Sequence, residues 1–310
     1  MMLHTKTLPA GWLGFDLNVL RRLKFGSVAM PFAADPLLGT YLKRHGARVA
    51  TNDVLRSAWT RSVAAIQNNN ERLSDEDLNT VLEDIYIPGH RLRNPALRTW
   101  FSETDSWWFD NARRNIDRLE SPFSFAIASS LVMAVGDYAR SFNDDNGELR
   151  QPLSNAFRRF WNSLPSPVNN GQTNTCQNQR VKEFIAETRT DLLFLRLPPA
   201  RTATRTGYTD DLMWKEEWLR EGSDFWPEID AMRSGSLGMP VETKSQYLQL
   251  LASFLGSAGH IRKWAIAHVE TGFVTAQDIV DTLNPIRKVE AVYTKDFSEL
   301  TGTKAVIITA

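Results

Sequence analysis

The stretch from Gly26 to Asp53 reads GSVAMPFAADPLLGTYLKRHGARVATND and decides the fold. It opens with a short apolar run, passes a turn, and continues in a helical pattern that ends at Gly46. A second strand is expected from Arg48 to Thr51. A strand, a helix and a strand in this order form a βαβ unit, in which the two strands lie parallel.

Later segments extend this pattern to the end of the chain. The run DLLFLRLPP at 191–199 predicts a third strand stopped by two prolines, and KWAIAHVE at 263–270 predicts a fourth, followed by a short helix at 275–283. The tail segments KVEAVYTKDF and KAVIITA are rich in β-branched residues and are typical of a hairpin. Alternating strands and helices predict an α/β fold with a doubly wound, mostly parallel sheet and a terminal antiparallel hairpin.

A long helical insertion is expected between the second and third strands, at residues 57–159. The chain would then divide into one domain made of 1–56 and 160–310, and the insertion. Within the insertion, Ser102 precedes a helical pattern and is a predicted N-cap. The stretch at 166–180, SPVNNGQTNTCQNQR, has almost nothing to bury, so we expect a mobile surface loop. Its amides could also lie against a nucleic acid, because amides can read base edges.

Composition narrows the function classes. Lys plus Arg equal Asp plus Glu at 36 each, so no global positive field draws the protein to nucleic acid, and DNA binding would need a local basic patch. One cysteine, Cys176, fits a reducing, cytoplasmic setting. The apolar run at 123–136 is too short to span a bilayer and predicts a buried helix, so no membrane partner is expected. The five histidines show no metal-site spacing, and we predict no metal site.

The order of motifs resembles the D12 class of adenine-specific DNA methyltransferases. The matching stretches are PFAADPLLGTYLKRHGARVATND at 31–53, FDNARRNIDRLE at 109–120, DLLFLRLPPA at 191–200, and the two closing strands. The resemblance spans nearly the whole chain from about Lys24. It implies a Rossmann-like methyltransferase fold, S-adenosylmethionine as cofactor, DNA as partner, and a target-recognition-like role for residues 57–159.

The resemblance also assigns cofactor-binding positions. The class has a Phe-x-Gly-x-Gly turn that lets the backbone approach the methionine part of S-adenosylmethionine, because glycine lacks a side chain. Here the turn begins at Phe32, and the two glycine positions hold Ala34 and Pro36. An added methyl group and a lost backbone donor predict that cofactor binding is weak or lost. Asp53 stands where an acid holds the ribose hydroxyls, although it is also readable as a simple strand-end or N-cap aspartate.

The catalytic motif Asp-Pro-Pro-Tyr aligns with Leu197, Pro198, Pro199 and Ala200. In the class, the acid and a proline carbonyl accept hydrogen bonds from the amine of a flipped adenine, and the aromatic residue stacks on the base. Leucine accepts no hydrogen bond and alanine has no ring face, so the motif indicates degenerate catalysis. Arg201 and Arg205 follow in a loop that faces the substrate in the class, and they are candidate nucleic-acid contacts.

Three hypotheses follow. The first is a catalytically degenerate relative of DNA adenine methyltransferases that acts as a subunit binding DNA, a protein partner or an oligomer mate. The second is an active methyltransferase with divergent motifs, in which backbone carbonyls near Pro198 and an aromatic side chain from elsewhere support transfer. The third is a Rossmann-like interaction module without a nucleic-acid role, which the neutral net charge favours.

Overall fold

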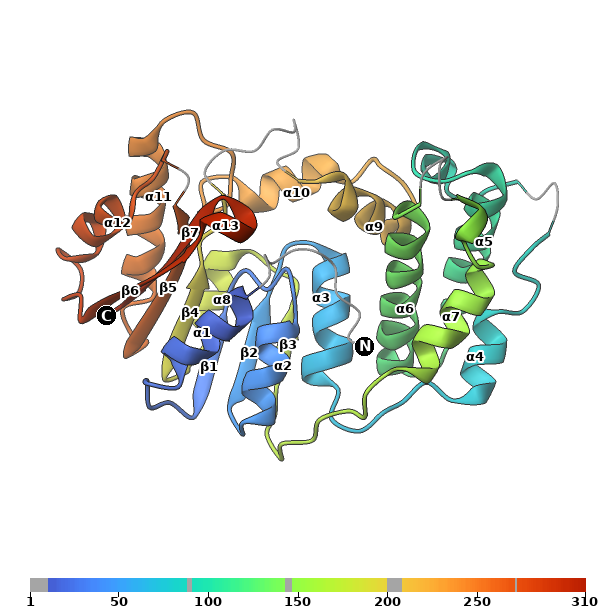
Figure 1. Cartoon of the computed structure of the whole chain (residues 1–310), viewed down its shortest axis with the longest axis horizontal. Coiled ribbons are helices and arrows are strands. Elements are labelled where there is room, and N and C mark those ends of the chain that lie inside the picture. Colours follow the sequence, from blue (N-terminus) through green and yellow to red (C-terminus); the bar gives the residue numbers. More distant parts are fainter. Residues whose placement is uncertain (1–10, 88–90, 143–146, 200–207, 271) are drawn as a thin grey trace.

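A mixed β-sheet forms the centre of one half of the molecule (Figure 1). The computed structural model describes residues 11–87, 91–142, 147–199, 208–270 and 272–310. Within these residues the sheet has seven strands in the order β3-β2-β1-β4-β5-β7-β6. The strands are β1 (Ser27–Met30), β2 (Arg48–Asn52), β3 (Thr175–Gln177), β4 (Leu192–Arg196), β5 (Lys263–Glu270), β6 (Ala291–Phe297) and β7 (Thr303–Thr309).

The strand pairing confirms the predicted α/β class. Strand β1 pairs in parallel with β2 and β4, and β4 pairs in parallel with β5. The strands predicted at 48–51, 191–199 and 263–270 are present with boundaries within a few residues. Strand β7 runs antiparallel to both β5 and β6, so the predicted terminal hairpin is confirmed as well. The sheet is therefore mostly parallel with an antiparallel edge.

The structure corrects our prediction for the Asn- and Gln-rich stretch. We expected a mobile loop at 166–180, but β3 lies within it and pairs in parallel with β2. Amide side chains hold the stretch to the sheet: Asn174 Oδ1 accepts a hydrogen bond from Val49 N at 2.9 Å, and Asn170 Nδ2 donates to the Ala47 carbonyl at 2.8 Å. Side-chain amides supply partners that a composition-based prediction counts only as polarity.

Helices cover both faces of the sheet, as the βαβ pattern requires. Helices α8 (Val181–Glu187), α11 (Lys244–Ser257) and α12 (Ala276–Leu283) pack on one face. Helices α1 (Trp12–Leu20), α2 (Leu37–Arg44) and α3 (Arg56–Ser62) pack on the other, where α3 continues into a π-helical turn, η1 (Val63–Gln67). The sheet core therefore has two apolar layers, one on each side of the strands.

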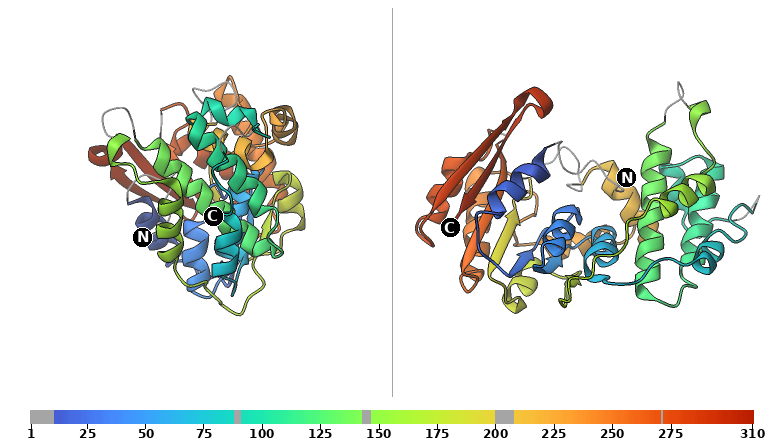
Figure 2. Two further views of the ribbon diagram at one scale, coloured as in Figure 1. Left: turned by 90° about the vertical axis from the view of Figure 1, so that its right-hand side faces the viewer. Right: turned by 60° about the horizontal axis from the view of Figure 1, so that its bottom comes forward.

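A separate helical body lies beside the sheet (Figures 1 and 2). It contains α4 (Asp75–Val81), α5 (Glu103–Ile116), α6 (Pro122–Arg140) and α7 (Leu153–Asn162), with the 3-10 turns η2 (Pro95–Thr99) and η3 (Gly147–Leu149). Its apolar cluster includes Trp108, Phe109 and Phe157. The N-cap predicted at Ser102 is confirmed, because its side chain accepts a hydrogen bond from Asp105 N. The target-recognition role of this body stays a prediction.

Helix α6 has the length and apolar composition of a membrane span. Of its most apolar 18-residue window, 61% is buried inside the structure. The window includes the run at 123–136, so the predicted buried helix is confirmed. The burial is that of a core helix of the helical body.

Helix α9 (Asp210–Arg220) connects the two bodies, and α10 (Trp226–Arg233) follows it across the top of Figure 1. The buried tryptophans of α9, Trp214 and Trp218, belong to the apolar cluster of the helical body. Its buried carboxylate Glu216 instead accepts hydrogen bonds from Arg56 N and Ser57 N, both at 2.8 Å, at the start of α3. One helix thus fixes the sheet layer and the helical body to each other.

Candidate functional site

The carboxyl ends of β1, β2 and β4 bring most of the predicted site residues to one edge of the sheet. Strand β1 has β2 on one side and β4 on the other, so the strand order reverses at β1. Ligands of open α/β sheets bind outside the carboxyl ends of the strands at such a point. Phe32 and Ala34 follow β1, Asp53 follows β2, and Leu197 follows β4. The predicted positions are therefore neighbours in space.

A side chain of the turn after β1, that of Asp35, accepts a hydrogen bond within the turn. Asp35 Oδ1 accepts a hydrogen bond from Leu37 N at 2.8 Å, which occupies a backbone donor at the start of α2. None of residues 31–37 adopts a positive φ angle. The turn therefore lacks the glycine-dependent conformation that would let a ligand approach the backbone.

Phe32 points away from the turn into the apolar layer under α11. Its ring packs against Phe254 with a centroid distance of 6.2 Å. Gly238 lies against the same ring at φ 98°, and a Cβ there would be 3.2 Å from Phe32 Cε1. Only glycine combines that φ with so close an approach.

Asp53 is partly enclosed at the end of β2. Its Oδ1 accepts a hydrogen bond from Leu55 N at 2.9 Å, in an Asx-type turn that leads into α3. Burial raises the pKa of its carboxyl group to about 7, and Glu216 adds to the effect, whereas Leu55 N and Arg61 act against it. The strand-end interpretation accounts for this hydrogen bond. Ribose binding stays a prediction.

At the end of β4, Leu197 is part of the core and is only 8% exposed. Its backbone N donates to the Ala267 carbonyl at 2.9 Å, so the strand pairing with β5 extends to this residue. The next carbonyl, that of Pro198, accepts a hydrogen bond from Tyr247 Oη at 2.8 Å. Tyr247 lies on α11 and is buried, and burial raises the pKa of its hydroxyl, which therefore stays a donor.

Three predicted residues lie outside the described part of the chain. These are Ala200, the fourth position of the catalytic motif, and the candidate nucleic-acid contacts Arg201 and Arg205. The neighbouring Arg196 is described, and its guanidinium pairs with the buried carboxylate of Asp16 on α1. Its side chain also covers the ring of Trp12 at 5.4 Å. Arg196 therefore holds α1 against the end of β4.

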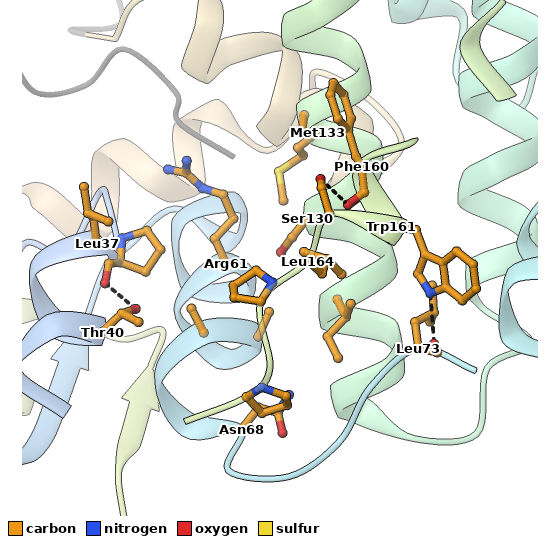
Figure 3. Close-up of a pocket in the computed structure, with 18 of the residues that line it drawn as sticks. Leu37, Thr40, Arg61, Asn68, Leu73, Ser130, Met133, Phe160, Trp161 and Leu164 are labelled. Carbon is orange, nitrogen blue, oxygen red and sulfur yellow. Dashed lines mark hydrogen bonds between the residues drawn. The ribbon is translucent and has the colours of Figure 1, made fainter. Parts of the chain in front are cut away.

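A cavity of about 770 Å³ lies between α2 and α3 on one side and α6 and α7 on the other (Figure 3). Apolar side chains, among them Met133, Phe160 and Leu164, form much of its wall. Arg61 lines the end opposite Asn68. The cavity also reaches Asp35 in the turn after β1, so it adjoins the candidate site.

Charged groups are buried where the cavity meets the site. Arg61 is 8% exposed and donates from Nη2 to the Ala34 carbonyl. Lys215 of α9 is 1% exposed, and its Nζ lies 2.6 Å from Asp137 Oδ1 of α6. Burial raises the pKa of Asp137, while Lys215 and Arg61 act to lower it. The two cations and this carboxylate form one electrostatic group.

S-adenosylmethionine is the cofactor that the resemblance implies, and the residues present do not fit it as that class would hold it. The glycine positions hold Ala34 and Pro36, the first donor of α2 is taken by Asp35, and Asp53 Oδ1 accepts from Leu55 N. We derive no chemical step through this cofactor.

The described residues contain no cluster of side chains suited to bind a metal ion. No group of three or more His, Cys, Asp and Glu side chains there could hold a metal ion. His268 is a buried strand residue, and its Nε2 lies 2.9 Å from the Val274 carbonyl. His268 is therefore a hydrogen-bonded core residue.

The chain is an α/β protein with a mostly parallel mixed sheet, a fold that is consistent with a methyltransferase-like architecture. The chain is similar to the Type II methyltransferase M2.HphI of Haemophilus parahaemolyticus, with 22% identity over 289 residues that cover 84% of this chain and 81% of that protein. No family model matches the chain. The similarity over most of both chains supports a methyltransferase relationship.

Sequence reasoning missed Arg61, Glu216 and Tyr247. Each acts through a partner more than 25 positions away, so no local motif announces it. One signal was present in the string WKEEW at 214–218, where three charged residues stand between two tryptophans. Such a string on a buried helix requires internal partners for its charges.

Proposed function

We propose that the chain is a catalytically degenerate relative of the D12 class of DNA adenine methyltransferases. In this proposal it keeps a Rossmann-like fold and acts as a non-catalytic subunit that binds DNA or a protein partner. The methyltransferase relationship and the parallel sheet with its antiparallel edge support the first part. The arrangement at the end of β4 supports the loss of catalysis, and the binding role is left to the test below.

One observation carries the proposal: Tyr247 Oη donates to the Pro198 carbonyl. Methylation of an exocyclic amine needs acceptors for the amine hydrogens, because they raise the nucleophilicity of the nitrogen. Leu197 supplies none, and the neighbouring proline carbonyl already has an internal donor. The active alternative relied on backbone carbonyls near Pro198, and the bond from Tyr247 occupies one acceptor position of one of them.

Methyl transfer is the direct test. The purified protein, at a concentration equal to that of a mixed-sequence duplex DNA, is incubated with S-adenosylmethionine that carries a radiolabelled methyl group. We expect no label in the DNA above that of a protein-free control. Label that increases with time and with protein concentration would contradict the proposal.

The binding role has its own test. Fluorescence anisotropy of a labelled 30-base-pair duplex is measured at about 50 mM and about 200 mM salt, since phosphate contacts weaken strongly over this range. Salt-dependent binding would assign the subunit to DNA. No binding at either salt concentration would assign it to a protein partner.

A further inference from the structure

Arg61 has an unusual position for an arginine. It lies on α3, is almost fully buried, and donates to the carbonyl of Ala34 in the turn after β1. Figure 3 shows its side chain extending from α3 at one end of the cavity. A guanidinium group is not deprotonated in proteins, so this is a buried positive charge.

Three carboxylates from three different elements act on this charge. Burial disfavours the charged form and lowers the pKa of Arg61, whereas Asp35, Asp137 and Asp53 raise it. Asp35 belongs to the turn after β1, Asp53 follows β2, and Asp137 lies on α6. Lys215 is the other buried cation here, and its Nζ is bound to Asp137. Burial outweighs the three carboxylates in the pKa of Arg61, and the carboxylates offset part of the cost of keeping this cation at the carboxyl ends of β1 and β2.

We propose that Arg61 is a built-in cation that occupies the place of a cationic ligand group at the carboxyl ends of β1 and β2. This inference deepens the proposed function and rests on it. S-adenosylmethionine carries a sulfonium and an ammonium charge in its methionine part, and the resemblance assigns that part to the turn after β1. Arg61 engages this turn from inside the protein, so the acidic surroundings are neutralised without a ligand.

The cavity makes the inference testable. Arg61, Asp35 and Asp137 line a cavity of about 770 Å³, so removal of the arginine side chain would leave a recess beside these two carboxylates that opens on existing space. A buried carboxylate group that loses its cation is strongly destabilising. A small planar cation that enters the recess from solution would restore the balance, because a ligand that binds only the folded state stabilises it.

The experiment compares the thermal unfolding of the full chain and its Arg61→Ala variant in three additives, each at about 50 mM. Guanidinium chloride supplies the missing group, urea supplies a neutral molecule of the same shape, and sodium chloride controls for ionic strength. We expect Arg61→Ala to lower the Tm by roughly 5 °C or more. Guanidinium should recover at least about 2 °C of the loss, and urea and sodium chloride should recover none.

Two further variants keep the test decisive. Arg44→Ala removes an arginine that lines the same cavity on the exposed end of α2, and it should show neither the loss nor the rescue. If Arg61→Ala does not fold, Arg61→Gln, which keeps part of the side chain and removes the charge, takes its place in the same comparison.

The inference is overturned if guanidinium and urea act equally on the variant, or if neither raises its Tm, since a merely structural arginine would behave in this way. The result is separable from the proposed function. Methyl transfer to DNA by the unmodified protein would contradict the proposed function whatever the rescue shows, and failed rescue without methyl transfer would overturn this inference alone.

Discussion

At the scale of single residues, the proposed loss of catalysis rests on the pairing of Tyr247 with the Pro198 carbonyl. This part-buried hydrogen bond holds Pro198 against α11. The contact joins α11 to the end of β4 across 49 positions of sequence. The resemblance placed Pro198 at the motif, but it could not reveal which group would use the carbonyl.

Tyr247→Phe is expected to destabilise the protein. The substitution removes this part-buried hydrogen bond, which costs about 0.5–1.5 kcal/mol. Urea unfolding of the variant measures the loss. Tyr293→Phe on the edge strand β6 is the matched control and should change the free energy of unfolding by less than about 0.5 kcal/mol. Equal stability of Tyr247→Phe and the parent protein would mean that the bond contributes nothing.

Asp53 predicts a pH dependence. Burial raises the pKa of its carboxyl group to about 7 in the folded protein from an ordinary value of 3.8. The folded state therefore favours the protonated form. Its contribution to stability is full below about pH 4 and is lost as the pH rises to about 7.

Asp53→Asn removes this titration and keeps an acceptor for Leu55 N. Relative to the parent protein, the variant should gain stability between pH 5 and pH 8, by at most about 4 kcal/mol for a shift of this size. Urea unfolding at both pH values measures the difference. A stability difference that does not change with pH would show that the carboxyl group titrates normally.

At the scale of elements, α9 determines how the helical body meets the sheet. Glu216 accepts hydrogen bonds from the first backbone donors of α3, a favourable place for a negative charge. Glu217, next to it, accepts from Trp100 Nε1 at 2.6 Å and from Trp226 Nε1 at 3.1 Å. Neighbouring carboxylates on one helix therefore bind two different bodies.

Glu216→Ala should loosen the start of α3. It removes a buried carboxylate that also pairs with Arg220, and the loss is expected to be about 3 kcal/mol. Hydrogen exchange of Arg56 and Ser57 amides reports the local effect. Glu228→Ala is the control, because Glu228 also contacts Arg220 but its side chain is 62% exposed. Unchanged protection at the start of α3 in Glu216→Ala would contradict this account.

Gly136→Ala tests the packing of α6 against α9. A Cβ at Gly136 would lie 2.2 Å from Trp214 Cη2, so the ring or the helix must move, at a cost of at least about 1–3 kcal/mol. Gly256→Ala on α11 is the control, since nothing lies within 4 Å of the added carbon there, and it should be neutral or slightly stabilising. A neutral Gly136→Ala would mean that the contact is loose. Thermal unfolding distinguishes the two variants.

The elements themselves were largely predictable. Hydrophobic runs bounded by turn residues gave β1, β2, β4, β5, β6 and β7, because buried strands need apolar side chains whatever their partners are. Strand β3 was not predicted, because it has only three residues and is held by the amides of the preceding stretch. The contacts of α9 were not predicted either, since the tertiary partners of charged side chains leave no periodic signal in the sequence.

At the scale of the whole molecule, a sheet body and a helical body enclose a cavity beside the candidate site (Figure 3). The methyltransferase relationship and the position of the site follow from the order of motifs, which sequence preserves. Whether the site binds a ligand depends on groups that converge from α3, α6, α9 and α11. We propose that Arg61 and Tyr247 supply those groups from within the chain.

The most direct measurement is a calorimetric titration of the purified protein with S-adenosylmethionine, with Asp53→Ala as the control variant. The account predicts no saturable heat of binding in either protein up to about 1 mM ligand, a limit that corresponds to about −4 kcal/mol of binding free energy. Saturable binding by the parent protein that is lost in Asp53→Ala would contradict the account and would assign Asp53 to the ligand.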